Sequence, residues 1–160
     1  MQKTSLIIKV LNVIILVFHW VFVVFYFFKL PNIIPIHFDL DGNVDGYGSK
    51  KSIILLPIIS TGIFFLLQYM SKNPYAPGLN IPDEMRENPQ LTELFLQSLC
   101  LLCLLMFVSI DWEITQVAVG KIPPQLFMPI VLLVLMFIMM FVFFYIAKRI
   151  KKNKLKNNLS

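Results

Sequence analysis

Four long apolar stretches constrain this sequence more than any other feature. They cover roughly residues 6–28, 53–70, 91–110 and 126–147. A helix rises about 1.5 Å per residue, so each stretch is long enough to cross about 30 Å of hydrocarbon. Charged residues make up only 14% of the 160 residues, against about 25% in an ordinary soluble domain. We therefore expect an all-α membrane protein, in which residues 1–147 form a single domain: a bundle of four transmembrane helices.

The distribution of Lys and Arg predicts how these helices are oriented, because positively charged loops stay in the cytoplasm. With the N-terminus inside, ten of the 14 Lys and Arg residues fall on the cytoplasmic side, six of them in a basic tail over residues 148–160. Both termini are therefore predicted to be cytoplasmic. The tail directly follows an apolar run, which favours contact with anionic lipid headgroups over nucleic-acid binding. The loop between the first two helices then lies outside the cell.

One face of the first helix carries polar residues at a spacing of seven, which an α-helix keeps on one side with a drift of only about 20°. Polar groups inside a membrane usually face the interior of a bundle. His19 is then either a proton or ligand site, or a neutral histidine bonded to another helix. The polar stripe consists of Ser5, Asn12, His19 and Tyr26. Its candidate partners are Thr61, Gln68, Gln97, Ser98 and Ser109.

The acidic residues all lie near predicted helix ends or in loops. Asp111 and Glu113 follow the third apolar stretch, so we place them outside, where either could pair with Lys50 or Lys51. No acid is then expected in mid-membrane, and this argues against an ion-coupled transporter, which commonly uses a carboxylate relay.

Cys100 and Cys103 have the spacing of a redox motif. On a helix, however, Cβ atoms three residues apart are about 5 to 6 Å from each other, too far for a disulfide. We expect both thiols to serve packing.

The outer loop HFDLDGNVDGYGSK, residues 37–50, begins like a calcium-binding loop at Asp41. The bidentate Glu that such a loop needs at its twelfth position is replaced by Ser52. A second metal interpretation places His37, Asp39 and Asp41 on one side of an extended strand, but these ligands make a poor zinc site. A third interpretation is an ordered lid, in which glycines permit tight turns and Asp and Asn side chains cap them.

The segment LPNIIPIHFDLDGNVDGYGSKKSIILLP resembles a bacterial membrane domain of unknown function, number sixteen-forty-eight, found at the start of SdpI-type immunity proteins. The signature of that domain reads L-P-x-x-I-P-x-H-F, then G-x-x-D-x-x-G-S-K, then a span with an early L-P. The matching positions are Leu30, Pro31, Ile34, Pro35, His37, Phe38, Gly42, Asp45, Gly48, Ser49, Lys50, Leu56 and Pro57. The resemblance implies a bacterial cell membrane. In those relatives the protein protects its producer from a secreted membrane-active toxin and can hold a repressor at the membrane.

No nucleophile, base and orienting group occur together, and there is no glycine loop for phosphate, so we expect no enzyme, no cofactor and no metal site. The first hypothesis is a lid that recognises an extracytoplasmic peptide or toxin and either protects the membrane or signals inward. The alternatives are a small transporter or channel component that uses Asn12, His19 and Tyr26, or an assembly partner of another membrane protein. The residues expected to form the lid or ligand site are His37, Phe38, Asp45, Ser49 and Lys50.

Overall fold

The computed structural model describes residues 2–39, 41–123, 125 and 127–157, without the side chains of residues 154, 155 and 157. Its elements, in chain order, are α1 (Gln2–Phe27), β1 (Ile33–Phe38), β2 (Val44–Ser49), the 3-10 helix η1 (Lys50–Ile54), α2 (Leu55–Lys72), α3 (Asp83–Arg86), α4 (Pro89–Ala118) and α5 (Phe127–Asn157).

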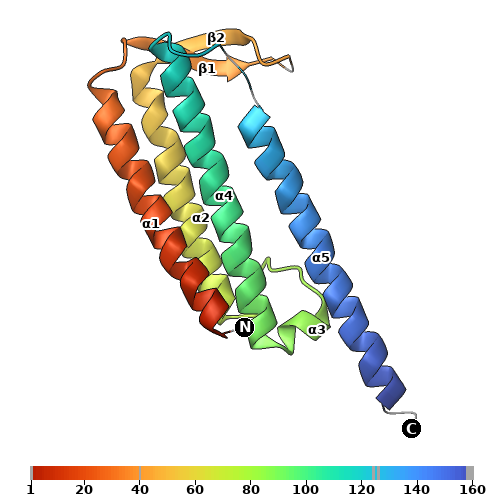
Figure 1. The fold of residues 1–160 in the computed structure, drawn as a ribbon. Coiled ribbons are helices and arrows are strands. Elements are labelled where there is room, and N and C mark those ends of the chain that lie inside the picture. The colour runs from red at the N-terminus through yellow and green to blue at the C-terminus, as the bar shows by residue number, and fades with distance from the viewer. Residues whose placement is uncertain (1, 40, 124, 126, 158–160) are drawn as a thin grey trace.

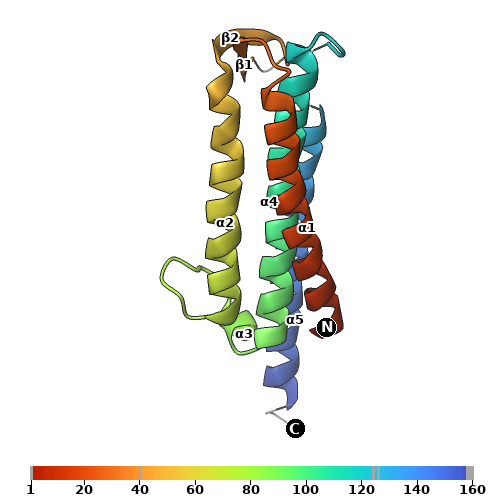
Figure 2. The same cartoon turned by 90° about the vertical axis from the view of Figure 1, so that its left-hand side faces the viewer.

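Within the described residues, four helical segments are long and apolar enough to cross a membrane: α1, η1 with α2, α4, and α5. Helices α1, α2 and α4 run side by side, and α5 packs against α4 and the short α3 (Figure 1, Figure 2). The chain is therefore a mainly helical, multi-pass membrane protein, which confirms the predicted fold class.

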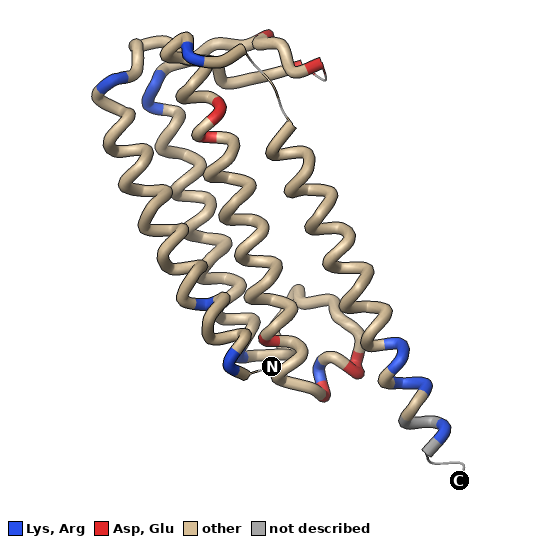
Figure 3. The backbone as a smooth tube through the Cα atoms, in the orientation of Figure 1, with Lys and Arg blue, Asp and Glu red and all other residues tan. Residues whose placement is uncertain are grey.

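The two ends of the bundle differ. Strands β1 and β2 form a hairpin across one end, which we call the hairpin end, while the start of α1 and the end of α5 lie at the opposite, tail end (Figure 1). Charged residues gather toward these two ends and leave the middle of the bundle largely uncharged (Figure 3). The basic residues predicted to form a tail continue α5 as helix as far as Asn157.

Helix α4 begins two residues before the predicted apolar stretch and ends later. The side chain of Asn88 accepts a hydrogen bond from the backbone N–H of Leu91 at 3.2 Å, so Asn88 caps the helix that starts at Pro89. The helix continues to Ala118, eight residues past the predicted boundary at residue 110. The boundary was wrong because Asp111 and Glu113, which suggested a helix end, are buried and hydrogen-bonded within the protein.

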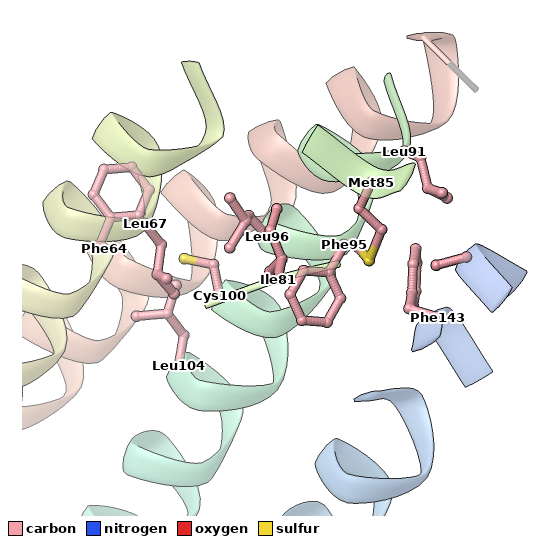
Figure 4. Close-up of a cluster of buried hydrophobic side chains, with 11 residues drawn as sticks. Phe64, Leu67, Ile81, Met85, Leu91, Phe95, Leu96, Cys100, Leu104 and Phe143 are labelled. Carbon is pink, nitrogen blue, oxygen red and sulfur yellow. The ribbon is translucent and has the colours of Figure 1, made fainter. Parts of the chain in front are cut away.

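Two clusters of buried apolar side chains hold the helices together. The larger, or tail-end core, joins α2, α4 and α5 and includes Phe64, Phe95, Leu104 and Phe143 (Figure 4). Cys100 belongs to this core, and both Cys100 and Cys103 are free thiols. Because lipid is as apolar as these side chains, their association depends on close packing rather than on the hydrophobic effect. The smaller, or hairpin-end core, consists of Val23, Leu30, Ile34 and Ile53.

The connector between α2 and α4 is ordered by hydrogen bonds to its backbone. Arg86 donates to the carbonyl of Leu79 at 2.8 Å, and the hydroxyl of Thr92 donates to the carbonyl of Met85 at 2.6 Å. Lys151 on α5 and Glu84 on α3 form an ion pair at 3.2 Å. The connector thereby holds the tail-end part of α5 close to α4.

Candidate functional site

The predicted outer lid is a β-hairpin, a structure the sequence did not predict. Strand β1 pairs with β2 in antiparallel fashion, with Ile33 opposite Ser49 and His37 opposite Gly46. Two glycines allow close contact across the hairpin. A Cβ on Gly48 would lie 2.6 Å from Cδ1 of Ile36, and one on Gly46 would lie 2.9 Å from Cβ of His37. A larger residue at Gly46 would push against Cβ of His37 and shift the strands, whereas one at Gly48 would displace the end of the Ile36 side chain.

The turn of the hairpin is stabilised by Asp39. Its carboxylate accepts hydrogen bonds from the backbone N–H of Asn43 at 2.8 Å and from the Asn43 amide at 3.2 Å. These two bonds, the backbone one first, hold the pKa of Asp39 below its ordinary value of 3.8. Gly42 supplies the positive φ, 86°, that the turn requires.

His37 and Asp45 face each other across the hairpin. Nδ1 of His37 is hydrogen-bonded to Oδ1 of Asp45, and both side chains are largely exposed. Beside this pair is a hollow of about 190 Å³ between the hairpin and α4. It is lined by Ile36, His37, Phe38, Ile110, Glu113 and Ile114. Glu113 is nearly fully buried and accepts a hydrogen bond from the backbone N–H of Gln125 at 2.7 Å.

Ser49 and Lys50 form the base of the hairpin. The Ser49 hydroxyl accepts from the backbone N–H of Lys51 at 3.3 Å and so caps η1. The Lys50 ammonium donates to the carbonyl of Leu30 at 3.3 Å and lies 5.2 Å from the ring centre of Phe27. Of the five predicted lid residues, three therefore adjoin the hollow or its rim, and two fix the hairpin to the helix ends.

One of the proposed calcium ligands has another partner. Asp45 is bonded to His37, and the carboxylate that orders the turn is that of Asp39, which lies before the proposed loop. Within the described part of the chain, no three His, Cys, Asp or Glu side chains are grouped as metal ligands would be.

A second polar site lies inside the bundle, around His19. Nε2 of His19 is 2.7 Å from Oδ2 of Asp111, and Nδ1 is 3.2 Å from the hydroxyl of Ser60. All three side chains are fully buried, and they come from α1, α4 and α2. Placing Asp111 outside and pairing it with Lys50 or Lys51 was therefore wrong: the acid lies within α4, seven residues before its end, and its partner is His19.

The hydrogen bonds around His19 indicate where its protons lie. The hydroxyl of Ser60 donates to the carbonyl of Pro57 at 3.0 Å, which leaves its lone pairs for His19. Nδ1 of His19 then carries a proton, and Nε2 shares another with Asp111. The pair is net neutral whether that proton sits on the ring or on the carboxyl. Neutrality is favoured here, because an unpaired charge buried in an apolar bundle is costly.

A third group of polar side chains, nearer the tail end, joins the same three helices. The amide of Asn12 donates to both the carbonyl and the side-chain oxygen of Gln97, at 3.1 and 3.0 Å. Gln97 and Gln68 exchange two amide hydrogen bonds of 3.0 Å. This network is separated from the His19 site along α4 by Cys100 and Leu104, both fully buried and apolar.

The other stripe residues and candidate partners have local roles. Tyr26 is half-buried and its ring centre lies 4.8 Å from that of Phe22. Thr61 accepts from the indole of Trp20 at 3.0 Å, and Ser109 donates to the carbonyl of Met106 at 2.7 Å. Ser98 is half-buried on α4. Sequence reasoning identified Gln68 and Gln97 but missed Ser60 and Asp111 as neighbours of His19.

The comparisons with known proteins agree with part of the predicted resemblance. Residues 14–61 match the family described as Domain of unknown function (DUF1648). An uncharacterized protein of Archaeoglobus fulgidus is 24% identical over 142 residues, covering 78% of this chain and 78% of that protein. No solved structure matches the chain. The matched segment contains the hairpin, His19 and Ser60, whereas Asp111 and the amide network's Asn12 lie outside it.

Proposed function

We propose that this protein recognises an extended peptide, such as a membrane-active toxin, at its hairpin, and that it protects the membrane or signals inward without acting as an enzyme. The observation that carries this proposal is the exposed hairpin anchored across the end of an otherwise apolar bundle. Its base is fixed by Lys50 and Ser49, while its two strands project beyond the helices (Figure 1). An exposed two-stranded sheet is a suitable platform for a peptide.

The hairpin offers the two features that peptide recognition by strand addition needs. It has only two strands among the described residues, so each strand has an edge whose backbone groups can pair with another chain. It also presents apolar side chains to solvent: Ile33 is 66% exposed, Ile36 49% and Tyr47 65%. Backbone pairing would provide affinity, and these side chains with the neighbouring hollow would provide selectivity.

The charges support a hairpin that faces the outside of a bacterial cell. The tail end holds the basic cluster of α5 with Lys3, Lys72 and Arg86, and the hairpin end has fewer cations (Figure 3). By the positive-inside rule, the tail end and both termini are cytoplasmic. A regulator held at the membrane would then bind the connector or the basic end of α5. The basic end of α5 also favours contact with anionic lipid.

The types of residue at His19 resemble a hydrolytic triad, but their setting argues against catalysis. Ser60, His19 and Asp111 are all fully buried, and the Ser60 hydroxyl is bonded to a carbonyl within its own helix. A substrate could reach none of these groups without the bundle opening. This supports a non-enzymatic role.

Cells that express variant proteins test the proposal directly. Wild-type protein, Tyr47→Ala and Tyr69→Ala would be expressed at equal levels, and survival and membrane potential would be followed during exposure to a panel of membrane-active peptides. Tyr69 is a matched control, because it is 55% exposed but lies near the tail end of α2. We expect protection by wild type and Tyr69→Ala and its loss in Tyr47→Ala. Equal survival of cells with any of the three proteins would refute the proposal, and so would survival equal to that of cells without the protein.

The second candidate, a small transporter or channel component, is favoured by the buried His19–Asp111 pair, because ionisable groups inside membranes often mark ion pathways. Two buried apolar layers oppose it: the hairpin-end core above the pair, and Cys100 with Leu104 below it. Flux of protons into liposomes containing the protein, lost in His19→Ala, would support transport. Flux equal to that of empty liposomes would argue against it.

A further inference from the structure

The His19–Asp111 pair is buried and yet incompletely bonded. We propose that it is a proton-binding site that exchanges its shared proton with water from the hairpin end, past Thr115, and that Ile34 of the hairpin is the closure of this route. The inference does not depend on what the hairpin binds. It rests on unpartnered oxygens, on the layer that covers them, and on the surroundings of the pair.

Two buried oxygens mark the direction of the route. Oδ1 of Asp111 and the hydroxyl of Thr115 have no hydrogen-bond partner within the described part of the chain, although both residues are 0% exposed. Residues four apart on a helix lie on the same face with Cβ atoms about 5 to 6 Å apart, a gap that one water molecule can bridge. Thr115 lies one turn nearer the hairpin end, so it extends the polar site toward that end.

The next layer toward the hairpin is apolar. Val23 follows His19 by one turn of α1, and Ala118 follows Thr115 by about one turn of α4; both contribute to the hairpin-end core or pack against it. Ile34 and Ile53 complete this layer, and Ile34 is 1% exposed. Of the four core residues, only Ile34 belongs to the hairpin. A movement of the hairpin would therefore withdraw Ile34 and admit water to Thr115.

Among the residues that the structure describes, no other charged group is positioned to replace Asp111 as the partner of His19. Helix α2 contributes the neutral Ser60, and on α4 the carboxylate of Glu113 accepts from the backbone of Gln125. At the hairpin end, the Lys50 ammonium donates to a carbonyl and His37 is bonded to Asp45. On α5, residues 127–147 include no Asp, Glu, Lys, Arg or His. The exchange replaces one hydrogen of the pair by one from water, so the net charge does not change.

Nuclear magnetic resonance of the ring nitrogens tests this route, because the chain has only two histidines. The full-length protein, labelled with ¹⁵N in histidine and placed in lipid nanodiscs, would be transferred into D₂O. The exposed His37 would serve as the internal reference for rapid exchange. In wild type, we expect the ring hydrogens of His19 to exchange much more slowly than those of His37. Equally fast exchange at both rings would overturn the proposal.

Two matched substitutions distinguish a local closure from general loosening. Ile34→Ala opens the hairpin-end core, and Ile81→Ala removes the same atoms from the tail-end core, where Ile81 is 6% exposed. We expect Ile34→Ala to accelerate exchange at His19 at least about tenfold, which corresponds to about 1.4 kcal/mol for the opening step. Ile81→Ala should change it little. Equal acceleration by both would contradict the assignment of Ile34, and Ile34→Val with Ile81→Val would replace them if either alanine variant fails to fold.

Thr115→Val tests the route itself, because it keeps the shape of the side chain and removes the hydroxyl. In the Ile34→Ala background, we expect Thr115→Val to slow the exchange at His19 substantially, toward the wild-type rate. Ser109→Ala, which removes a hydroxyl bonded within α4, is the control and should have no such effect. An unchanged rate in Thr115→Val would show that water reaches the pair by another path.

Discussion

Removing one member of the buried His19–Asp111 pair should destabilise the bundle much more than removing both. Unit charges 2.7 Å apart attract by about 6 kcal/mol at an effective dielectric constant of about 20, and this attraction is offset by a burial cost of several kcal/mol per ion. Breaking a buried pair typically costs about 3 to 5 kcal/mol, because the remaining group is left without a partner. The loss of stability in His19→Leu should lie near the upper end of this range, since Oδ1 of Asp111 already has no partner among the described residues.

The assay is reversible unfolding in mixed micelles, followed by fluorescence of the two tryptophans. Trp20 and Trp112 are adjacent in sequence to His19 and Asp111, so they report on this site. We expect His19→Leu and Asp111→Leu each to lose about 3 to 5 kcal/mol, and the double variant to lose less than either single variant. Thr61→Val, which removes the half-buried bond to Trp20, is the control and should cost about 1 kcal/mol. Additive losses in the double variant would refute the coupling.

Three further predictions concern the hairpin and the amide network. Gly46→Ala should loosen the hairpin, because its Cβ would lie 2.9 Å from Cβ of His37. Gly62→Ala, whose Cβ would have nothing within 4 Å, should stabilise α2 by about 0.5 to 1 kcal/mol. Amide hydrogen exchange of β1 measures the first effect, and thermal unfolding measures the second. Because the pKa of Asp39 is lowered, its contribution to the stability of the turn is fully present above pH 3.8 and is lost as the pH falls through the lowered pKa. The amide resonance of Asn43 should follow this change with pH. Asp39→Asn should abolish the pH dependence of that resonance. Gln97→Leu should cost about 1 to 3 kcal/mol in the unfolding assay, because it leaves the amides of Asn12 and Gln68 without their side-chain partner. An unchanged stability would contradict a stabilising role of the amide network.

The sequence was sufficient for the four helices, because an apolar run of membrane length leaves few alternatives. It also indicated that Gln97 is a partner for Asn12 of α1 and that Gln68 joins the same network, since amides inside a membrane require hydrogen bonds. These inferences depend on local composition and on helical periodicity alone.

The hairpin and the buried ion pair were harder to predict for a physical reason: both depend on contacts between distant residues. His37 and Asp45 meet only because the turn at Gly42 sets the register of the two strands. Asp111 resembled a residue at a helix end, and what permits it inside the bundle is His19, 92 positions earlier in the chain. The one sign that the helix extends beyond Asp111 was that no Gly or Pro interrupts the sequence from there to Ala118.

Recognition of a peptide by the hairpin is the central claim, and amide hydrogen exchange tests it most directly. The protein in nanodiscs would be compared with and without a membrane-active peptide against which it protects cells. We predict slower exchange in residues 33–38 and 44–49 when the peptide is present, with little change in the connector at residues 73–88. Slower exchange confined to the lipid-facing helices, or none at all in the hairpin, would contradict the proposed function.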